Sequence, residues 1–204
     1  MKYMELIKYL DPELLIRTVG LLGYFAIVFA ESGLIFGFIF PGDSLLFTAG
    51  FLAPSLGVNI WLLAIGTVVM AILGDSVGYY FGKKVGPALF KKEDSLFFKK
   101  AHLMKAEAFF EKHGPRSIIL ARFIPVVRTF TPILAGVARM NYATFLRYNI
   151  IGGILWGAGL TLLGSFLGSV IPDIDKYLVP IVLVIIVVSF IPVFIGIYQG
   201  MKNK

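Results

Sequence analysis

The chain has 204 residues, of which 58% are hydrophobic, 19 are phenylalanine and none is cysteine, and its formal net charge is +7. Long apolar runs recur along it, which is typical of an integral membrane protein and argues against a soluble domain. The lack of cysteine excludes disulfides, zinc thiolate sites and iron–sulfur clusters, and in such a chain an excess of Lys and Arg indicates topology and anionic lipid rather than nucleic acid.

The first predicted element is a transmembrane helix over residues 14–30. Lys2 and Lys8 precede it, and Val28-Phe29-Ala30 is an acceptable signal-peptidase site. However, three acidic residues lie in the corresponding n-region, and the apolar run is long for a signal peptide. We therefore expect a retained membrane helix with the N-terminus in the cytoplasm.

The next stretch, residues 31–58, is apolar but contains two acids and a helix breaker. In ESGLIFGFIFPGDSLLFTAGFLA, Glu31 and Asp43 bracket a run that Pro41-Gly42 interrupts. Irregular backbone at membrane depth is tolerated where it lines a cavity or is buried in protein. The pattern predicts a re-entrant hairpin and loop that enter and leave from the external side, followed by a transmembrane helix over 59–82.

A basic stretch over residues 83–115 orients the chain. Together with the adjoining Arg116 it contains nine of the 19 basic residues, namely Lys83, Lys84, Lys91, Lys92, Lys99, Lys100, Lys105, Lys112 and Arg116. The positive-inside rule places this loop in the cytoplasm. Within it, residues 93–114 have the apolar periodicity of an amphipathic helix lying on the membrane surface. We expect structural roles for His102 and His113, which lie here away from any acidic cluster.

The C-terminal half also contains an apolar stretch that is interrupted by helix breakers, but its orientation is the opposite one. Residues 116–138 are apolar but lie between basic segments, so both ends should be cytoplasmic, and Pro125 and Pro132 supply breaks. This predicts a second re-entrant hairpin, entering from the cytoplasm. Transmembrane helices over 146–168 and 178–198 follow, and the C-terminus returns to the cytoplasm.

The fold class predicted from these elements is an all-α membrane protein built as an inverted repeat. Each repeat is a re-entrant helical hairpin followed by a transmembrane helix, with flanking membrane helices and the cytoplasmic amphipathic helix. An offset of 82 residues aligns Asn59 with Asn141 and Gly82 with Gly164, and Ala49-Gly50 matches Ala135-Gly136 if four residues are dropped from the external loop. Inverted repeats with broken helices are a recurrent plan of secondary transporters.

Five charged residues lie inside the apolar segments, and they are the candidate site: Glu31, Asp43, Asp75, Arg122 and Arg128. Each ionised group at bilayer depth costs about 2.5 to 3.5 kcal/mol on insertion scales, so they should face one another or a wet cavity. Simpler roles stay open. Glu31 could lie in the external headgroup region, Asp43 could cap a helix, and Asp75 could pair with Lys83, about 12 Å further along a helix.

Four stretches resemble the DedA family of bacterial membrane proteins, within the wider VTT (SNARE-associated Golgi protein) superfamily: FPGDSLLFTAGFLA, GDSVGYYFGKKVG, EKHGPRSIILARFIPVVRTFTPILAGVARM and YNIIGGILWG. The resemblance covers about residues 20 to 170. It implies a translocator of undecaprenyl phosphate or phosphatidylethanolamine that depends on the proton motive force. It also implies functional roles for Glu31, Asp43, Arg122 and Arg128, supported by Pro41, Gly42, Asp75, Pro125, Thr129 and Pro132.

The residues themselves agree with that implication. Arginine offers a fork of N–H donors that matches phosphate oxygens, so Arg122 and Arg128 are expected to bind a lipid phosphate. Glu31 and Asp43 would compete for those arginines when ionised and release them when protonated. An uncoupled scramblase and a non-transporting scaffold remain alternatives, sodium could replace the proton, and a homodimer stays open. An enzyme is not expected, nor is any metal or cofactor, because no nucleophile and general acid lie together.

Overall fold

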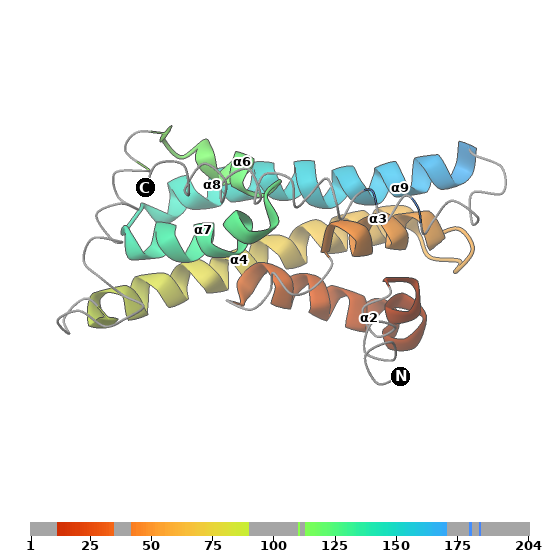
Figure 1. The fold of residues 1–204 in the computed structure, drawn as a ribbon, viewed down its shortest axis with the longest axis horizontal. Helices are drawn as coiled ribbons and strands as arrows, with labels where there is room; N and C mark the ends of the chain where they lie inside the picture. The colour runs from red at the N-terminus through yellow and green to blue at the C-terminus, as the bar shows by residue number, and fades with distance from the viewer. Residues whose placement is uncertain are drawn as a thin grey trace.

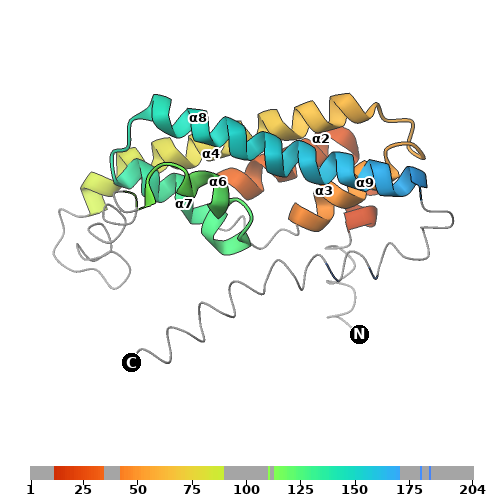
Figure 2. The ribbon, with the colours of Figure 1, turned by 90° about the horizontal axis from the view of Figure 1, so that it is seen from above.

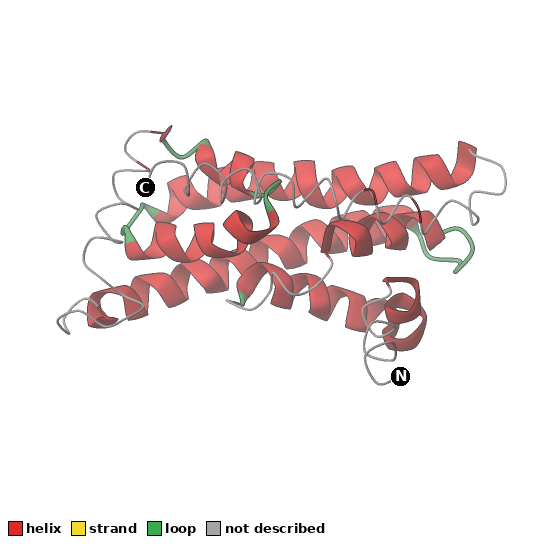
Figure 3. Cartoon of the chain, in the orientation of Figure 1, coloured by secondary structure: helices red, strands yellow, loops and turns green. Residues whose placement is uncertain are grey.

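The computed structural model describes residues 12–34, 42–89, 110, 113–170, 180 and 184. These residues are helical apart from short connections, and no strand occurs among them (Figure 3). Several predictions fall outside the described residues: most of the amphipathic helix, the transmembrane helix over 178–198, both chain ends, His102 and Pro41.

Two long helices run the length of the molecule. The first is α4 (Ile60–Leu89), and the second is continuous through α8 (Tyr142–Gly153), the π-helix η2 (Ile154–Ala158) and α9 (Gly159–Val170). Both are long and apolar enough to cross a membrane, and they overlap the spans predicted over 59–82 and 146–168. Because α4 continues to Leu89, Lys83 and Lys84 lie in its last turns, not in the loop predicted to begin at residue 83.

Both long helices begin at an asparagine cap. The Asn59 side chain accepts a hydrogen bond from Trp61 N at 2.9 Å, and the Asn141 side chain accepts one from Ala143 N at 2.9 Å. Each cap satisfies donors that the first turn of a helix leaves without an intrahelical partner.

The outward faces of the long helices are apolar. On α4 the large exposed side chains recur every three or four residues, and they are Leu62, Ile65, Val69, Leu73, Val77 and Tyr80. The second long helix exposes Ile151, Leu155, Leu163, Phe166 and Val170 in the same way. A soluble monomer rarely exposes so continuous an apolar stripe, so these faces are suited to contact with lipid hydrocarbon.

The first hairpin consists of α2 (Pro12–Gly33) and α3 (Gly42–Leu52). This differs from the straight transmembrane helix predicted over 14–30, because α2 is broken at Gly20, where φ is 64° and ψ is −169°. That conformation is open to glycine and costly for other residues, and a hydropathy pattern does not register it. The apolar segment Gly20–Gly33 is about 20 Å long, and it forms the first arm of the hairpin.

The second hairpin consists of α6 (Ser117–Ala121) and α7 (Pro125–Val137). The chain turns between them at residues 122–124, and Pro125 occupies the first turn of α7, where its missing N–H has no cost. Pro132 lies inside α7, which continues through it. The prediction that Pro132 also breaks the hairpin was therefore wrong, and only Pro125 marks a break.

The two hairpins occupy opposite halves of the molecule (Figures 1 and 2). We call the end with residues 53–59 the loop end, and the end with Lys83 and Lys84 the basic end. The α2–α3 hairpin lies toward the loop end and the α6–α7 hairpin toward the basic end. Near the middle of the two long helices, the end of α2 and the start of α3 approach the start of α7, so residues at these helix ends can meet there.

Close glycine contacts attach each hairpin to the long helix of the other half. At the loop end, a Cβ on Gly50 of α3 would collide with the carbonyl oxygen of Thr161, and a Cβ on Gly164 of α9 would collide with that of Phe47. Backbones can approach this closely only where side chains are absent.

The basic end repeats this arrangement residue for residue. A Cβ on Gly136 of α7 would collide with the carbonyl oxygen of Tyr79, and a Cβ on Gly82 of α4 with that of Ile133. The offset is 86 residues between the hairpin arms and 82 between the long helices, and the latter also relates the two asparagine caps. The two halves therefore use equivalent positions for equivalent contacts.

Candidate functional site

The inner ends of the two hairpins supply four of the five intramembrane charges at the centre of the molecule, and α4 supplies the fifth. Arg128, in the first turns of α7, is held by two carboxylates from the other hairpin. Its Nη2 donates to Glu31 Oε1 at the end of α2, and its Nη1 donates to Asp43 Oδ1 at the start of α3, 2.5 Å away. Arg128 is 7% exposed and Glu31 is fully buried. The two hairpins are thus joined through one guanidinium group.

Trp156 completes this part of the site. Its indole Nε1 donates to Asp43 Oδ1 at 2.7 Å, and the guanidinium carbon of Arg128 lies 4.6 Å from the centroid of its ring. A cation over the face of an indole is attracted by the ring quadrupole, and the attraction grows when water is excluded. Trp156 therefore fixes both members of the Asp43–Arg128 ion pair.

Arg122 forms a second buried ion pair near Trp156. Its Nη2 donates to Asp75 Oδ2 on α4 and to Asn149 Oδ1 on α8, and Asn149 Nδ2 donates to Ile72 O at 3.2 Å. The guanidinium carbon of Arg122 lies 5.8 Å from the Trp156 ring centroid. Both arginines, although six residues apart with a helix break between them, therefore lie around one indole ring.

The charges in this cluster do not balance. Glu31, Asp43 and Asp75 face Arg122 and Arg128, which leaves one negative charge in excess among the described groups when all are ionised. Three buried atoms of the cluster make no hydrogen bond within the described residues: Glu31 Oε2, Arg122 Nε and Arg128 Nε. A buried polar atom without a partner is costly unless water, a proton or a ligand satisfies it. The cluster therefore holds one acceptor and two donors whose hydrogen-bonding capacity the described residues do not use.

The residues expected to support the site contribute in different ways. A Cβ on Gly42 would overlap the Glu31 carboxylate, so glycine is required there for Glu31 to reach Arg128. Thr129 is 1% exposed and donates to Pro125 O at 3.3 Å. Pro132 packs against Gly78 of α4, 3.4 Å from where a Cβ would lie. Pro41 is outside the described residues.

One of the simpler roles left open by the sequence was wrong. Asp75 pairs with Arg122 and not with Lys83, whose Nζ lies 6.0 Å from the centroid of the Tyr79 ring. Lys83 lies eight positions after Asp75 on the regular helix α4, whereas the turn after α6 carries Arg122 directly to Asp75. Glu31 is fully buried within the protein, against Arg128. Asp43 does lie in the first turn of α3, but its carboxylate contacts Arg128 and Trp156.

Trp156 and Asn149 were not among the candidates from the sequence. They lie seven residues apart, which places them on one face of a helix, and an asparagine inside an apolar span was a signal for this face. Trp156 also lies in η2, where the helix widens to π geometry. Single π turns within α-helices are frequent at functional sites. Among the described residues no group of three or more His, Cys, Asp or Glu side chains could hold a metal ion.

Comparisons with known proteins agree on one family. The sequence profile of the VTT domain matches residues 40–166. The chain is 41% identical to Protein DedA of Escherichia coli (strain K12), covering 88% of this chain and 81% of that protein. It is 46% identical to an uncharacterized membrane protein of Mycobacterium leprae, covering 96% of this chain and 87% of that protein. A further uncharacterized membrane protein, from Mycobacterium tuberculosis (strain ATCC 25618 / H37Rv), is 48% identical over 89% of this chain and 81% of its own length. No solved structure matches.

Proposed function

This chain belongs to the DedA family of VTT-domain membrane proteins, and on that basis we propose that it is a transporter that moves a phosphate-bearing lipid across the bacterial cytoplasmic membrane. Undecaprenyl phosphate is the first candidate cargo, and a phospholipid such as phosphatidylethanolamine is the second. The proposed coupling is to protons. In this proposal the loop end faces outward, the basic end faces the cytoplasm, and both hairpins are re-entrant.

The observation that carries the proposal is the pair of buried arginines around Trp156. Lipid phosphate is an anion, and its passage through hydrocarbon requires cationic donors at mid-membrane. Arg122 and Arg128 are 3% and 7% exposed, and each has an Nε that makes no hydrogen bond within the described residues. These N–H groups are available to phosphate oxygens, and guanidinium groups match phosphate in geometry as well as charge.

The carboxylates supply a means of coupling. As long as Glu31 and Asp43 are ionised they occupy both Nη groups of Arg128. A proton on Glu31 removes the excess negative charge of the cluster and releases Nη2, so phosphate can take its place. Loss of that proton restores the ion pair and expels the phosphate. Binding of phosphate and uptake of a proton therefore favour each other.

The equivalent halves supply a means of alternating access. Each hairpin is attached by glycine contacts to the long helix of the other half, and the cluster lies where the two hairpins meet. If the loop-end contact loosens, the cluster opens to one side; if the basic-end contact loosens, it opens to the other. Rocking of inverted halves around a fixed central site is the usual mechanism for such a layout.

The decisive experiment is translocation in proteoliposomes of fluorescent undecaprenyl phosphate and fluorescent phosphatidylethanolamine, with and without an imposed pH gradient. The variants are Glu31→Gln and Arg128→Ala. Arg147→Ala is the matched control, because Arg147 lies on α8 but is exposed. We expect gradient-dependent movement of one lipid in the wild type and in Arg147→Ala, and no movement in Arg128→Ala that still folds. Glu31→Gln should lose the gradient dependence.

Other outcomes identify the alternatives. Movement of both lipids without any effect of the gradient would make the protein a scramblase. A sodium gradient that replaces the pH gradient would change the coupling ion. No movement of either lipid by folded wild-type protein would exclude both cargoes and favour a scaffold, in which the ion pairs only stabilise the fold.

A further inference from the structure

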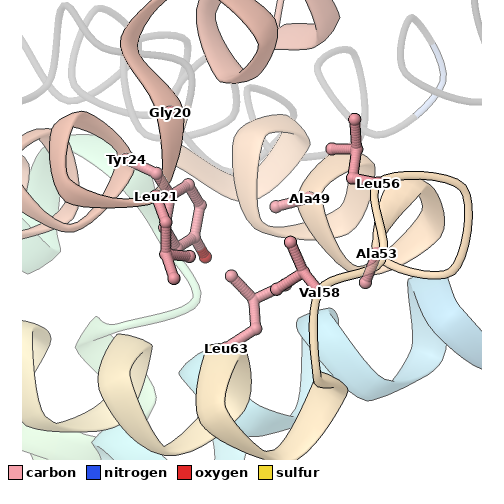
Figure 4. A pocket seen from close by; sticks show the side chains of 8 residues that line it. All are labelled: Gly20, Leu21, Tyr24, Ala49, Ala53, Leu56, Val58 and Leu63. Atoms are coloured by element: carbon pink, nitrogen blue, oxygen red, sulfur yellow. The ribbon is translucent and has the colours of Figure 1, made fainter.

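A second feature lies apart from the charge cluster, at the loop end. It is a partly open cavity of about 230 Å³ between α2, α3 and the start of α4. Figure 4 shows that Leu21 and Tyr24 of α2, Ala49 of α3, Ala53 just after α3, and Leu63 of α4 surround it. The cavity exists because the small side chains of Ala49 and Ala53 face the place where α2 is broken at Gly20.

The walls of this cavity offer no charge. Tyr24 carries the one polar side chain among the lining residues, and its hydroxyl is hydrogen-bonded to Thr67 Oγ1 at 2.7 Å. Thr67 in turn donates to Leu63 O at 2.7 Å. A water molecule needs two to four polar partners to occupy a buried site, and apolar cavities of about 150 Å³ stay dry and bind hydrocarbons. This cavity is therefore suited to a hydrocarbon group.

The surroundings identify the source of that hydrocarbon. Leu62 and Ile65 lie on the same turn of α4 as the lining residue Leu63, and they are 56% and 63% exposed on the apolar stripe. In the proposed membrane placement, this turn of α4 adjoins the lipid layer. The same hairpin that forms the cavity carries Glu31 and Asp43, and the cavity lies nearer the loop end than these two acids do.

The cavity is separate from the arginine cluster. Tyr24 and Glu31 lie seven residues apart on α2, about 10 Å along the helix. Val28 of α2 and Leu45 of α3 lie between these levels, and both are fully buried. A lipid whose phosphate contacts Arg128 therefore has no open direct line along α2 to this cavity.

We propose that this cavity is a docking site for one hydrocarbon chain of the transported lipid at the loop end, before its phosphate enters or after it leaves the arginine cluster. The identity of the lipid rests on the proposed function, whereas the site itself rests on the cavity. Selection here is by chain shape and not by headgroup, because the lining residues present no ionised group.

The test is photo-crosslinking of the full-length protein in proteoliposomes with dodecyl phosphate that carries a diazirine at the chain end, and with dodecanol that carries the same group. The labelled peptides are identified by mass spectrometry. Leu63→Trp fills the cavity, and Leu62→Trp adds the same bulk on the lipid-facing side as the matched control. Arg128→Ala removes the phosphate site.

We expect both probes to label the peptides that contain Leu21, Tyr24 and residues 49–58. Labelling should fall several-fold in Leu63→Trp and stay unchanged in Leu62→Trp and Arg128→Ala. Label spread evenly over the lipid-facing stripe, or unaffected by Leu63→Trp, would overturn the docking site. Labelling by the phosphate probe alone, lost in Arg128→Ala, would also overturn it, because the cavity would then belong to the arginine site. Translocation by the wild type tests the proposed function independently of these results.

Discussion

At the scale of single residues, the centre of this protein is an ion-pair network whose members come from five separate helices or turns. Removing one partner of a buried ion pair leaves an uncompensated charge, which costs far more than the pair itself contributes. Arg128 is the extreme case, because its guanidinium group contacts two carboxylates and one indole ring. Its substitution therefore affects folding as well as transport, and the two effects must be separated.

The first prediction measures the effect on folding alone, by means of a double substitution. Arg128→Ala should lower the free energy of unfolding by about 3 to 5 kcal/mol, because Glu31 stays buried without its partner. Adding Glu31→Gln to the same chain should recover most of that loss, since the neutral amide needs no counter-charge. The measurement is denaturant or thermal unfolding in detergent, with Arg147→Ala as control. If the losses of unfolding free energy caused by the two single substitutions add up in the double variant, the proposed coupling of Glu31 and Arg128 would be contradicted.

The second prediction concerns Trp156. Trp156→Phe keeps an aromatic ring beside Arg128 but removes the N–H that donates to Asp43. A hydrogen bond to a charged group contributes about 1.5 to 3 kcal/mol, so lipid translocation should fall by about tenfold or more. The other tryptophan provides the control, because Trp61 is 63% exposed on the apolar stripe, and Trp61→Phe should transport normally. Full activity in Trp156→Phe would show that the indole N–H is dispensable.

The sequence predicted the charged members of this network but not the neutral ones. A charge inside an apolar segment has a cost that demands an explanation, so Glu31, Asp43, Asp75, Arg122 and Arg128 were identified by energy alone. Trp156 and Asn149 are uncharged, so they lack the cost of an ionised group. A tryptophan also occurs both in protein cores and against lipid. Only the three-dimensional contacts reveal that their polar atoms serve the cluster.

At the scale of helices and turns, the hairpins are held by pairs of glycines that let backbones touch. These contacts occur at equivalent positions in the two halves, so they should contribute similar amounts to the free energy of unfolding. They are also the contacts that would loosen in alternating access, which makes them sensitive to any added side chain. The breaks were only partly predictable. Pro125 begins a helix as expected, whereas Gly20 breaks α2 through a backbone conformation that no hydropathy pattern contains.

The third prediction uses two glycines of α9 and one glycine of α4. Gly164→Ala places a methyl group against the backbone of α3, and overpacking of this kind costs about 1 to 3 kcal/mol. Gly82→Ala at the equivalent position of α4 should cost a similar amount. Gly159→Ala is the control, because no atom lies within 4 Å of its Cβ position, so it should be neutral or stabilise by up to about 1 kcal/mol. Thermal unfolding of the three variants measures this, and equal effects of Gly164→Ala and Gly159→Ala would refute the contact.

At the scale of the whole molecule, the two halves lie head to tail, with one hairpin toward each end of the long helices. The distribution of Lys and Arg among the loops was sufficient to predict opposite orientations for the two halves, because the positive-inside rule depends on that distribution and not on local geometry. The distance that each hairpin extends along the long helices could not be predicted from the sequence. That distance depends on where α2 and α6 end, and those ends are determined by contacts with the other half.

The fourth prediction tests the orientation of the two ends. The chain has no cysteine, so single substitutions can be labelled without background. Ser55→Cys, in the exposed loop after α3, should react with a membrane-impermeant maleimide from the outside of intact cells. His113→Cys, exposed before α6, should react only after the cells are opened. Labelling of both from the same side would contradict the opposed hairpins.

The meeting of two short hairpins at mid-depth has an electrical consequence. Where the two hairpins meet, charged and polar groups replace hydrocarbon, so in the proposed membrane placement the voltage drops mainly across the layers on either side of the cluster. A charge that moves between the cluster and one surface crosses part of that voltage, and a full crossing corresponds to about 2.3 kcal/mol per elementary charge at 100 mV. A phosphate monoester carries about −1.5 to −2 charges, so in the proposed cycle the single proton bound with it does not cancel its charge, and their joint movement displaces charge through the field. In that cycle the resting voltage of the cell is a driving force in its own right, able to bias which side releases the lipid.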